Sequence, residues 1–433
     1  MVKQLARRLL PDKVWTRLQS IKATLLLRKL EEQWKQARGE LAQVVRAQGG
    51  PRRVLIAPAD PGSLVGSCGD EAMIEALKTM AAEAHPDVAI HILVDGPHAC
   101  GMAASLGMTP IDIWGRDDFV HSLVTLLREQ CYAAVIGVGA DIIDGFYGPP
   151  TPAKILVTLD VAARLGIPAV VLGASFSTKP DFRLKPFFDR LDPGVQLLIR
   201  DPISLARAQA FTTAPSELVA DSAFMLRASE PDPETLKWVQ ARRAEGKQVI
   251  GFNIHPMLLR RAHDDPEKLL IDPAFASLVD VTVDTAVAWL LIPHDNREIC
   301  SDHSILAPLY ERLKTRLDGN VQLFDRHRSA AELKAIAGTL DGVVTGRMHL
   351  AIASLGTGTP VLCIAYQDKF EGLLRHFDLP SDSLLGLKQL HQPEIFADRI
   401  RTFLGETREL RRHVAEHWPQ VLDYSRRNFD VLA

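Results

Sequence analysis

The sequence predicts an α/β protein with two doubly wound domains that face one another, preceded by an N-terminal helical arm. Three observations lead to this fold class. Apolar runs alternate with amphipathic stretches from about residue 53, and the alternation restarts near Lys247. A stretch without Gly or Pro, from Lys13 to Arg38, precedes both series. The chain has 433 residues, and single hydrophobic cores stop growing near roughly 250–300 residues. More than one domain is therefore expected.

Residues 1–50 are expected to form the helical arm, with one long amphipathic helix over residues 12–48. Its apolar residues recur at near-helical spacing: Val14, Leu18, Ile21, Leu25, Leu30, Trp34, Leu41 and Val44. Residues 1–30 hold eight Lys or Arg against one Asp, a net charge of +7. This charge suits an anionic membrane surface. A helix that caps its own domain or mediates self-association explains the apolar spacing equally, so both alternatives stay open.

Residues 51–230 are expected to form the first domain, which begins after the Gly-Gly-Pro sequence at residues 49–51. The expected strands lie within residues 53–59, 88–95, 132–139, 168–175, 195–201 and 216–223. Helices are expected at residues 70–84 and 152–166. Strands that are apolar on both faces are typical of a parallel sheet covered by helices.

Residues 231–433 are expected to form the second domain and its C-terminal helices. Its strands are expected within residues 247–256, 288–295, 320–325, 341–349 and 360–366. The crossover between the domains is expected near residues 228–240, where Pro and acidic residues precede a helical stretch.

The composition indicates a soluble protein of a reducing compartment. The net charge is −3, which gives no general attraction to nucleic acid. Five cysteines are widely spaced and form no C-x-x-C pair, so neither a disulfide framework nor a zinc knuckle is predicted. The basic N-terminus lacks the continuous apolar stretch of a secretory signal. We therefore expect a cytoplasmic protein.

Ligands of doubly wound sheets bind beyond the carboxyl ends of the strands, so the residues after each apolar run are the first candidates. Five places carry reactive or charged side chains there, and they contribute Asp70 with Glu71, Asp141, Arg200, His294, and Arg347 with His349.

Several of these candidates have a simpler structural explanation. Asp70 and Glu71 suit the N-terminus of a helix, where carboxylates cap free N–H groups. Asp141 follows a lone G-x-G, which is a weak dinucleotide signature without a third glycine. Arg200 suits a surface ion pair, and His294 suits a buried, hydrogen-bonded core position.

A metal centre is the alternative for the segment around His294, because Asp295, Asp302 and His303 lie nearby in sequence. Asp302 is better explained as the N-cap of the helix that follows it. We therefore predict no metal ion at this place.

Arg347 and His349 form the strongest pair. Two residues apart on an extended segment, their side chains point to one face, and a helix that begins there adds free N–H groups. Arginine binds phosphate or carboxylate with two parallel hydrogen bonds, and histidine can transfer a proton near neutral pH. The pair predicts an anion site.

The sequence resembles the polysaccharide pyruvyltransferases. The resemblance rests on "GDEAMIEAL", "VIGVGADIIDG", "IRDPISL", "VADSAF" and "IPHD", and above all on "VVTGRMHLAIASLGTGTPVLCIAYQDKFEGLL" at residues 343–374. It extends from about Val54 to Phe377. The family implies two Rossmann-like domains facing across a cleft, as in the GT-B glycosyltransferases. It also implies transfer of a pyruvyl group from phosphoenolpyruvate to a sugar, usually as a ketal.

The resemblance assigns roles to the candidates. Arg347, His349 and Arg200 would bind phosphoenolpyruvate as a cation cluster, with His349 as general acid or phosphate partner. Asp70 or Glu71 would orient or deprotonate the acceptor. The remaining binding candidates are His294, Asp141 and Lys369, the last of which also suits a solvated helix start. No separate cofactor is implied.

The acceptor is implied only as a sugar of a cell-surface or extracellular polysaccharide, or its lipid-linked precursor. The first loop, residues 58–72, is shorter than in many family members, which leaves the acceptor open. Two other functions stay as alternatives: a GT-B glycosyltransferase that uses a nucleotide sugar, and a catalytically silent glycan-binding protein. A place at the inner face of the plasma membrane, reached through residues 1–50, is expected if the arm binds lipid.

Overall fold

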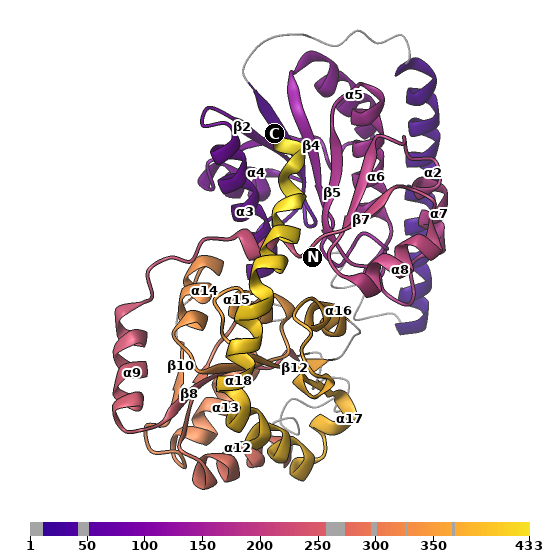
Figure 1. Cartoon of the computed structure of the whole chain (residues 1–433). Helices are drawn as coiled ribbons and strands as arrows, with labels where there is room; N and C mark the ends of the chain where they lie inside the picture. Colours follow the sequence, from indigo (N-terminus) through magenta and orange to yellow (C-terminus); the bar gives the residue numbers. More distant parts are fainter. Residues whose placement is uncertain (1–11, 42–51, 257–272, 296–300, 325–326, 366–368) are drawn as a thin grey trace.

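The structure, a computed structural model, describes residues 12–41, 52–256, 273–295, 301–324, 327–365 and 369–433, and it contains two parallel sheets (Figure 1). The first sheet has seven strands in the order β3-β2-β1-β4-β5-β6-β7. Its strands are β1 (Arg53–Ala57), β2 (Ala89–Val94), β3 (Thr109–Asp112), β4 (Tyr132–Val138), β5 (Ala169–Ala174), β6 (Val195–Ile199) and β7 (Ser216–Leu218).

The second sheet has six strands in the order β10-β9-β8-β11-β12-β13. Its strands are β8 (Gln248–Asn253), β9 (Val287–Leu291), β10 (Val321–Leu323), β11 (Gly342–Thr345), β12 (Val361–Ala365) and β13 (Leu384–Gly386). In both sheets the chain order reverses beside the first strand, between β1 and β4 and between β8 and β11. Such a switch point opens a crevice at the carboxyl ends of the strands.

Helices cover both sheets, as the doubly wound prediction requires (Figure 1). We call the part of the molecule with the seven-stranded sheet the first half and the part with the six-stranded sheet the second half. The helices of the first half are α2 (Asp12–Leu41), α3 (Cys68–Ala84), α4 (Pro97–Ser105), α5 (Phe119–Glu129), α6 (Pro150–Arg164), α7 (Lys185–Phe188) and α8 (Pro202–Phe211). Those of the second half are α9 (Pro233–Ala244), α12 (Pro273–Asp284), α13 (His303–Lys314), α14 (Ala330–Gly338), α15 (Met348–Leu355), α16 (Lys369–His376), α17 (Leu387–Leu390) and α18 (Pro393–Arg426).

Four short 3₁₀ helices complete the described elements. They are η1 (Phe182–Leu184), η2 (Ser222–Met225), η3 (Ser381–Ser383) and η4 (Arg427–Leu432). The last helix, α18, runs from the second sheet back to the first, so the C-terminus lies beside β4 (Figure 1). The chain first leaves the β7 edge through η2 and reaches β8 after α9. The limits 51–230 and 231–433 stay predictions for the two domains.

The arm helix α2 has two different halves. In its second half Leu27, Leu30 and Trp34 are buried, and the indole of Trp34 stacks on Phe187 with ring centroids 5.5 Å apart. The indole N–H also donates to Asp160 Oδ2 over 2.7 Å. In the first half the apolar side chains are exposed, and they are Val14, Leu18, Ile21, Leu25 and Leu26. One half of the helix therefore caps its own domain, and the other presents an apolar stripe. The expected continuation from 42 to 48 lies outside the described residues.

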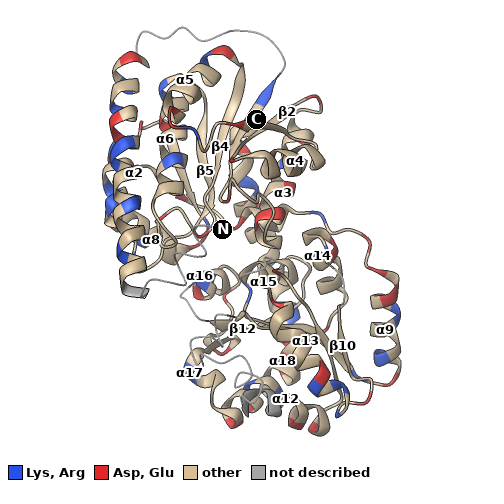
Figure 2. Ribbon diagram, turned by 180° about the vertical axis from the view of Figure 1, so that it is seen from behind, with Lys and Arg blue, Asp and Glu red and all other residues tan. Residues whose placement is uncertain are grey.

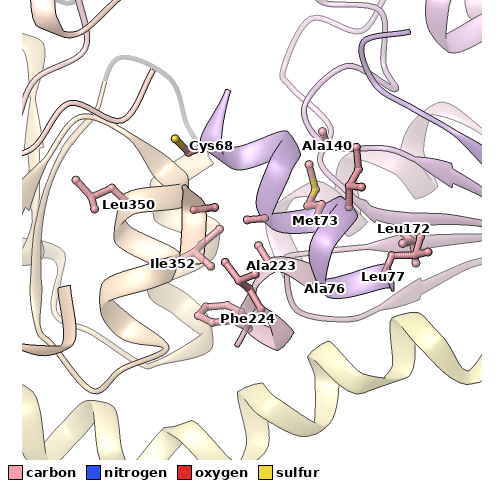
Figure 3. Close-up of a cluster of buried hydrophobic side chains, with 14 of the residues drawn as sticks. Cys68, Met73, Ala76, Leu77, Ala140, Leu172, Ala223, Phe224, Leu350 and Ile352 are labelled. Atoms are coloured by element: carbon pink, nitrogen blue, oxygen red, sulfur yellow. The ribbon is translucent and has the colours of Figure 1, made fainter. Parts of the chain in front are cut away.

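One hydrophobic cluster joins the two halves of the molecule (Figure 3). It brings Met73 and Leu77 of α3 together with Phe224 of η2, and with Leu350 and Ile352 of α15. All five side chains are at most 2% exposed. Burying such side chains contributes about 1.5–3 kcal/mol each. The two sheets are therefore held by a shared core, which fixes the residues at their facing ends.

Candidate functional site

The carboxyl ends of the strands of both sheets supply the polar residues at the junction. Several side-chain contacts between described residues link the halves there. Arg200 Nη2 lies 3.2 Å from Met348 Sδ, His349 Nε2 lies 3.8 Å from Asp221 Oδ2, and Lys369 pairs with Asp141. The predicted candidates Arg200, His349, Asp141 and Lys369 therefore meet at one place, as the strand-end argument anticipates.

Arg200 follows β6 and is 2% exposed. Its Nη1 donates to Asp221 Oδ2 over 2.9 Å, and its Nη2 donates to Ser175 Oγ over 3.0 Å. Its Nε finds no hydrogen-bond partner in the described part of the chain. A surface ion pair is therefore excluded by burial. An unsatisfied donor on a buried cation costs free energy unless a ligand accepts from it.

His349 lies in the first turn of α15, and its ring lies against Gly69 of α3. A Cβ atom built at Gly69 would lie 2.3 Å from His349 Nδ1, so no larger residue fits there. Nε2 of His349 is buried and has no hydrogen-bond partner among the described residues. Burial lowers the pKa of His349; the carboxylate of Asp221 opposes this, and the cation of Arg200 reinforces it.

Arg347 takes the N-cap position of α15 but directs its guanidinium to two carboxylates. Its Nε donates to Asp302 over 3.0 and 3.2 Å, and its Nη1 donates to Asp295 Oδ2 over 3.0 Å. The residue is 9% exposed. The two carboxylates offset much of its charge, so this arginine holds the loop after β9 against the loop after β11.

The expectation that Asp302 is the N-cap of the following helix is confirmed for its position, but the side chain has another role. Asp302 occupies the N-cap position of α13, but its carboxylate makes no capping hydrogen bond. Its Oδ2 accepts instead from Asn253 Nδ2 over 2.8 Å and from the backbone N–H of His294 over 3.0 Å. The guanidinium of Arg347 lies between Asp302 and Asp295, where a metal ion would have to bind, whereas His303 is exposed.

His294 is buried near the same cluster, with 5% of its surface exposed. Burial, together with the neighbouring His349 and Arg347, lowers the pKa of His294 to about 3 against the opposing effect of Asp295. The ring is therefore neutral at physiological pH. It can donate or accept a hydrogen bond, but it adds no positive charge to the junction.

Asp141 and Lys369 form an ion pair across the junction, and Lys369 Nζ also donates to the hydroxyl of Tyr147 over 3.1 Å. Burial alone would raise the pKa of Asp141, but Lys369 and then Arg200 hold it below its ordinary value. The carboxylate therefore stays ionised. The expectation of a solvated Lys369 is not matched, because its side chain is only 15% exposed.

Asp70 and Glu71 lie in the first turn of α3, as expected for acidic residues at a helix N-terminus, but the N-cap of this helix is Ser67. Ser67 Oγ accepts from the backbone N–H of Asp70 over 3.2 Å and donates to its carboxylate over 2.8 Å. The carboxylate of Glu71 accepts from the backbone N–H of Ala330, at the start of α14. Burial raises the pKa of Glu71 to about 7, against the effect of that hydrogen bond. A role toward an acceptor stays a prediction for both.

Sequence reasoning missed three residues that shape the site. Asp221 and Ser175 accept hydrogen bonds from Arg200, and Gly69 makes room for the ring of His349. Asp221 and Ser175 each follow an apolar run directly, which is the signal that identified Arg200. No local pattern identifies Gly69, because the side chain that lies against it, His349, comes from the second half of the molecule.

Comparison with protein families gives one match. A family model described as polysaccharide pyruvyl transferase matches residues 68–368, which is more than half of the 433 residues. The matched segment contains Asp70, Glu71, Asp141, Arg200, His294, Arg347 and His349, and it ends one residue before Lys369. A search of curated proteins found no match.

Solved structures share the fold at very low sequence identity. A glycosyltransferase from Rickettsia africae is 9% identical, with 88% of this chain and 100% of that chain covered and a TM-score of 0.52. A putative UDP-N-acetylglucosamine 2-epimerase from Listeria monocytogenes is 11% identical, with 88% and 95% covered and a TM-score of 0.55. The corresponding 2-epimerase from Neisseria meningitidis is 9% identical, with 88% and 99% covered and a TM-score of 0.53. These likenesses confirm the GT-B-like arrangement of two Rossmann-like sheets.

Proposed function

We propose that this chain uses phosphoenolpyruvate as its donor and a saccharide as its acceptor. The premise is that the chain belongs to the polysaccharide pyruvyl transferase family and is therefore a transferase. The product would be a pyruvyl ketal on a sugar of a cell-surface or extracellular polysaccharide, or on its lipid-linked precursor. The reaction would release inorganic phosphate.

One observation carries the donor assignment. Arg200 of the first half and His349 of the second lie at the same junction, and each keeps a buried nitrogen without a partner in the described part of the chain. Phosphoenolpyruvate carries a carboxylate and a phosphate on a three-carbon frame, so it can accept from donors on both sides. Buried polar groups without partners are uncommon in proteins and favour a ligand site.

The chemistry requires one proton to be delivered and two to be removed. Protonation of the methylene carbon of phosphoenolpyruvate makes the adjacent carbon electrophilic, and a sugar hydroxyl adds to that carbon and loses its proton. The bond from this carbon to the phosphate oxygen then breaks. A second hydroxyl adds in its place, and its proton leaves with the phosphate. Two hydroxyls and one phosphoenolpyruvate thus give a ketal and phosphate.

His349 is assigned the role of general acid for the methylene carbon. Burial lowers the pKa of His349, which disfavours the protonated ring. The negative charge of a bound phosphate would raise this pKa again, because an opposite charge nearby favours the imidazolium. Donor binding would therefore favour the protonated form of His349, which is the form that a general acid needs.

Arg200 is assigned to binding the donor through its free Nε, with Lys369 as a second cation. Arg347 is assigned a positioning role, since two carboxylates already occupy its guanidinium. Asp70 or Glu71 is assigned to the acceptor, because both follow Gly69, whose backbone lies against the ring of His349. His294 remains a neutral hydrogen-bonding candidate.

The location of the acceptor is proposed from the arm. The exposed residues of α2 include Leu18, Ile21 and Leu25, each between 47% and 59% exposed. Lys and Arg are spread along the same helix (Figure 2). Within the described residues, no helix combines the length and apolar character needed to cross a bilayer. We propose that the stripe rests on an anionic membrane at the cytoplasmic side, where lipid-linked saccharides are presented.

The direct test incubates the protein with phosphoenolpyruvate and a panel of lipid-linked and short saccharides. The expected result is release of phosphate together with a gain in the mass of one saccharide by a pyruvyl ketal. Parallel reactions contain UDP-sugars in place of phosphoenolpyruvate. Sugar transfer from a UDP-sugar without any reaction of phosphoenolpyruvate would contradict the proposal.

A further inference from the structure

We propose that Asp378, His413 and His417 form a binding site for a zinc ion on the outside of the second half. His413 and His417 lie one helical turn apart on α18, and Asp378 follows the end of α16. Their ligand atoms lie within 4.8 Å of one another. Two histidines at i and i+4 on one helix face, with a carboxylate from a second element, provide the nitrogen and oxygen ligands that Zn²⁺ prefers.

The hydrogen bonds of the two rings leave one nitrogen free on each. His413 Nε2 lies 2.9 Å from the backbone oxygen of Asp378, and His417 Nδ1 lies 3.0 Å from the backbone oxygen of His413. A carbonyl oxygen only accepts, so both of these nitrogens must carry the hydrogen. The lone pairs then lie on Nδ1 of His413 and Nε2 of His417. Metal-binding histidines are oriented in the same way, by an N–H bond from the other nitrogen.

The backbone at Asp378 takes a helix-ending conformation. Its φ is +47°, which is the left-handed region. The N–H of Asp378 donates to Arg375 over 3.3 Å, and the N–H of Leu379 donates to Leu374 over 3.1 Å. This is the helix end that normally takes glycine, because a side chain there is strained. Aspartate tolerates this conformation better than most residues, and here it places a carboxylate beside two histidines.

A small movement completes the site. Ligand atoms of a tetrahedral zinc site lie about 3.3 Å apart when each bond is about 2.0–2.1 Å long. Ligand atoms that lie up to 4.8 Å apart must therefore approach one another by up to about 1.5 Å, and the side chain of Asp378 is exposed. A water molecule would take the fourth position.

The ion would join two elements that belong to the junction. α16 carries Lys369 at its first residue, and His376 Nε2 lies 2.8 Å from the backbone oxygen of Arg200. α18 continues past the site, where Trp418 packs on Phe224 with ring centroids 5.7 Å apart. A bound ion would fix the end of α16 to α18 and so stabilise the closed arrangement of the two halves.

The test uses full-length protein without an affinity tag, stripped of metal with a chelator and then dialysed. Zn²⁺ binding is measured by calorimetry, and the thermal midpoint is measured with and without Zn²⁺. We expect one site whose affinity falls at least tenfold in His417→Gln and in Asp378→Asn. His121→Gln, a change at an exposed histidine on α5, is the matched control and should bind as the wild type does.

Asp378→Gly separates the effect of the left-handed backbone on stability from the effect of the carboxylate on zinc binding. Glycine relieves the left-handed strain, so the variant without metal should be at least as stable as the wild type, yet Zn²⁺ should raise its midpoint less. Equal zinc affinity in the wild type, Asp378→Gly and His417→Gln would overturn the proposal. No substrate is present, so this outcome is independent of whether pyruvyl transfer occurs.

Discussion

The imidazole of His349 rests on the backbone of Gly69, so a residue of the second half fills the space that a side chain of the first half would otherwise take. A Cβ atom at Gly69 would lie 2.3 Å from Nδ1 and 2.8 Å from Cε1 of the ring. Gly69 belongs to the first turn of α3, whose free N–H groups and positive dipole lie at the junction. The position of the proposed general acid therefore depends on the closed packing of both halves.

Gly69→Ala should displace the ring of His349 while leaving α3 intact. Real Cβ atoms do not approach other atoms to 2.3 Å, so either the ring or the junction must move. We expect turnover to fall by about 10²-fold, because misplacement by an ångström is costly in catalysis. The measurement is phosphate release from phosphoenolpyruvate. Gly101→Ala on α4 is the control, since nothing lies within 4 Å of its Cβ position, and it should keep full activity.

Arg347→Lys should reduce stability more than it weakens donor binding. Lysine keeps the charge but cannot make the paired contact with Asp302, whose carboxylate is buried. We expect the free energy of unfolding to fall by on the order of 1–3 kcal/mol. Arg375→Lys, in an exposed pair with Glu371, should change it by less than about 0.5 kcal/mol. A wild-type stability combined with a large rise in KM for phosphoenolpyruvate would instead place Arg347 on the donor.

Glu71→Gln should remove a pH dependence of stability. The pKa of Glu71 is raised from 4.5 to about 7, so between these values the folded state binds more protons than the unfolded state. Stability contributed by this residue is therefore present at pH 4.5 and is lost as the pH rises through about 7. At pH 8 the variant should be more stable than the wild type by on the order of 1–3 kcal/mol.

Denaturant titrations at pH 4.5 and pH 8 measure this difference. Glu83→Gln, at an exposed glutamate of the same helix, is the control and should follow the wild-type profile. If Glu71→Gln also follows that profile, Glu71 ionises normally and is exposed to solvent.

Local patterns predicted most of the fold. Each expected strand corresponds to an observed one, because the sequence of a buried parallel strand is typically a short run of apolar residues. Two edge strands were missed. β3 (Thr109–Asp112) contains Pro110 and has no buried residue, and β13 (Leu384–Gly386) is three residues long. Edge strands need only one neighbour, so their sequences carry a weak signal.

The sequence predicted which residues follow the ends of strands, because this depends on a local pattern. It did not predict which of these residues contact one another. Arg200 and His349 follow apolar runs, so the sequence placed them at the carboxyl ends. The contact of Arg347 with Asp302 joins residues 45 positions apart, and the contact of His349 with Gly69 joins the two halves. Such pairings depend on how the sheets dock, and no local pattern encodes them. No local pattern therefore indicated that Arg347 pairs with Asp295 and Asp302.

The exposed half of α2 should mediate binding to anionic vesicles. Leu18→Glu places a charge in a stripe that is otherwise apolar, so sedimentation with anionic vesicles should fall severalfold while activity on a short soluble saccharide stays unchanged. Val283→Glu, at an apolar residue of α12 that is 76% exposed, is the matched control and should sediment as the wild type does. A change from dimer to monomer in Leu18→Glu, without any change in vesicle binding, would favour self-association.

The central claim, that His349 protonates phosphoenolpyruvate at the junction, is tested most directly by the turnover of His349→Asn. Asparagine fits the space and keeps a hydrogen bond, but it cannot deliver a proton. We predict that kcat for phosphate release with a saccharide acceptor falls about 10²- to 10⁴-fold, with a smaller change in donor affinity and an unchanged melting temperature. His121→Asn, on the exposed face of α5, should retain wild-type turnover. Wild-type turnover in folded His349→Asn would contradict the assignment.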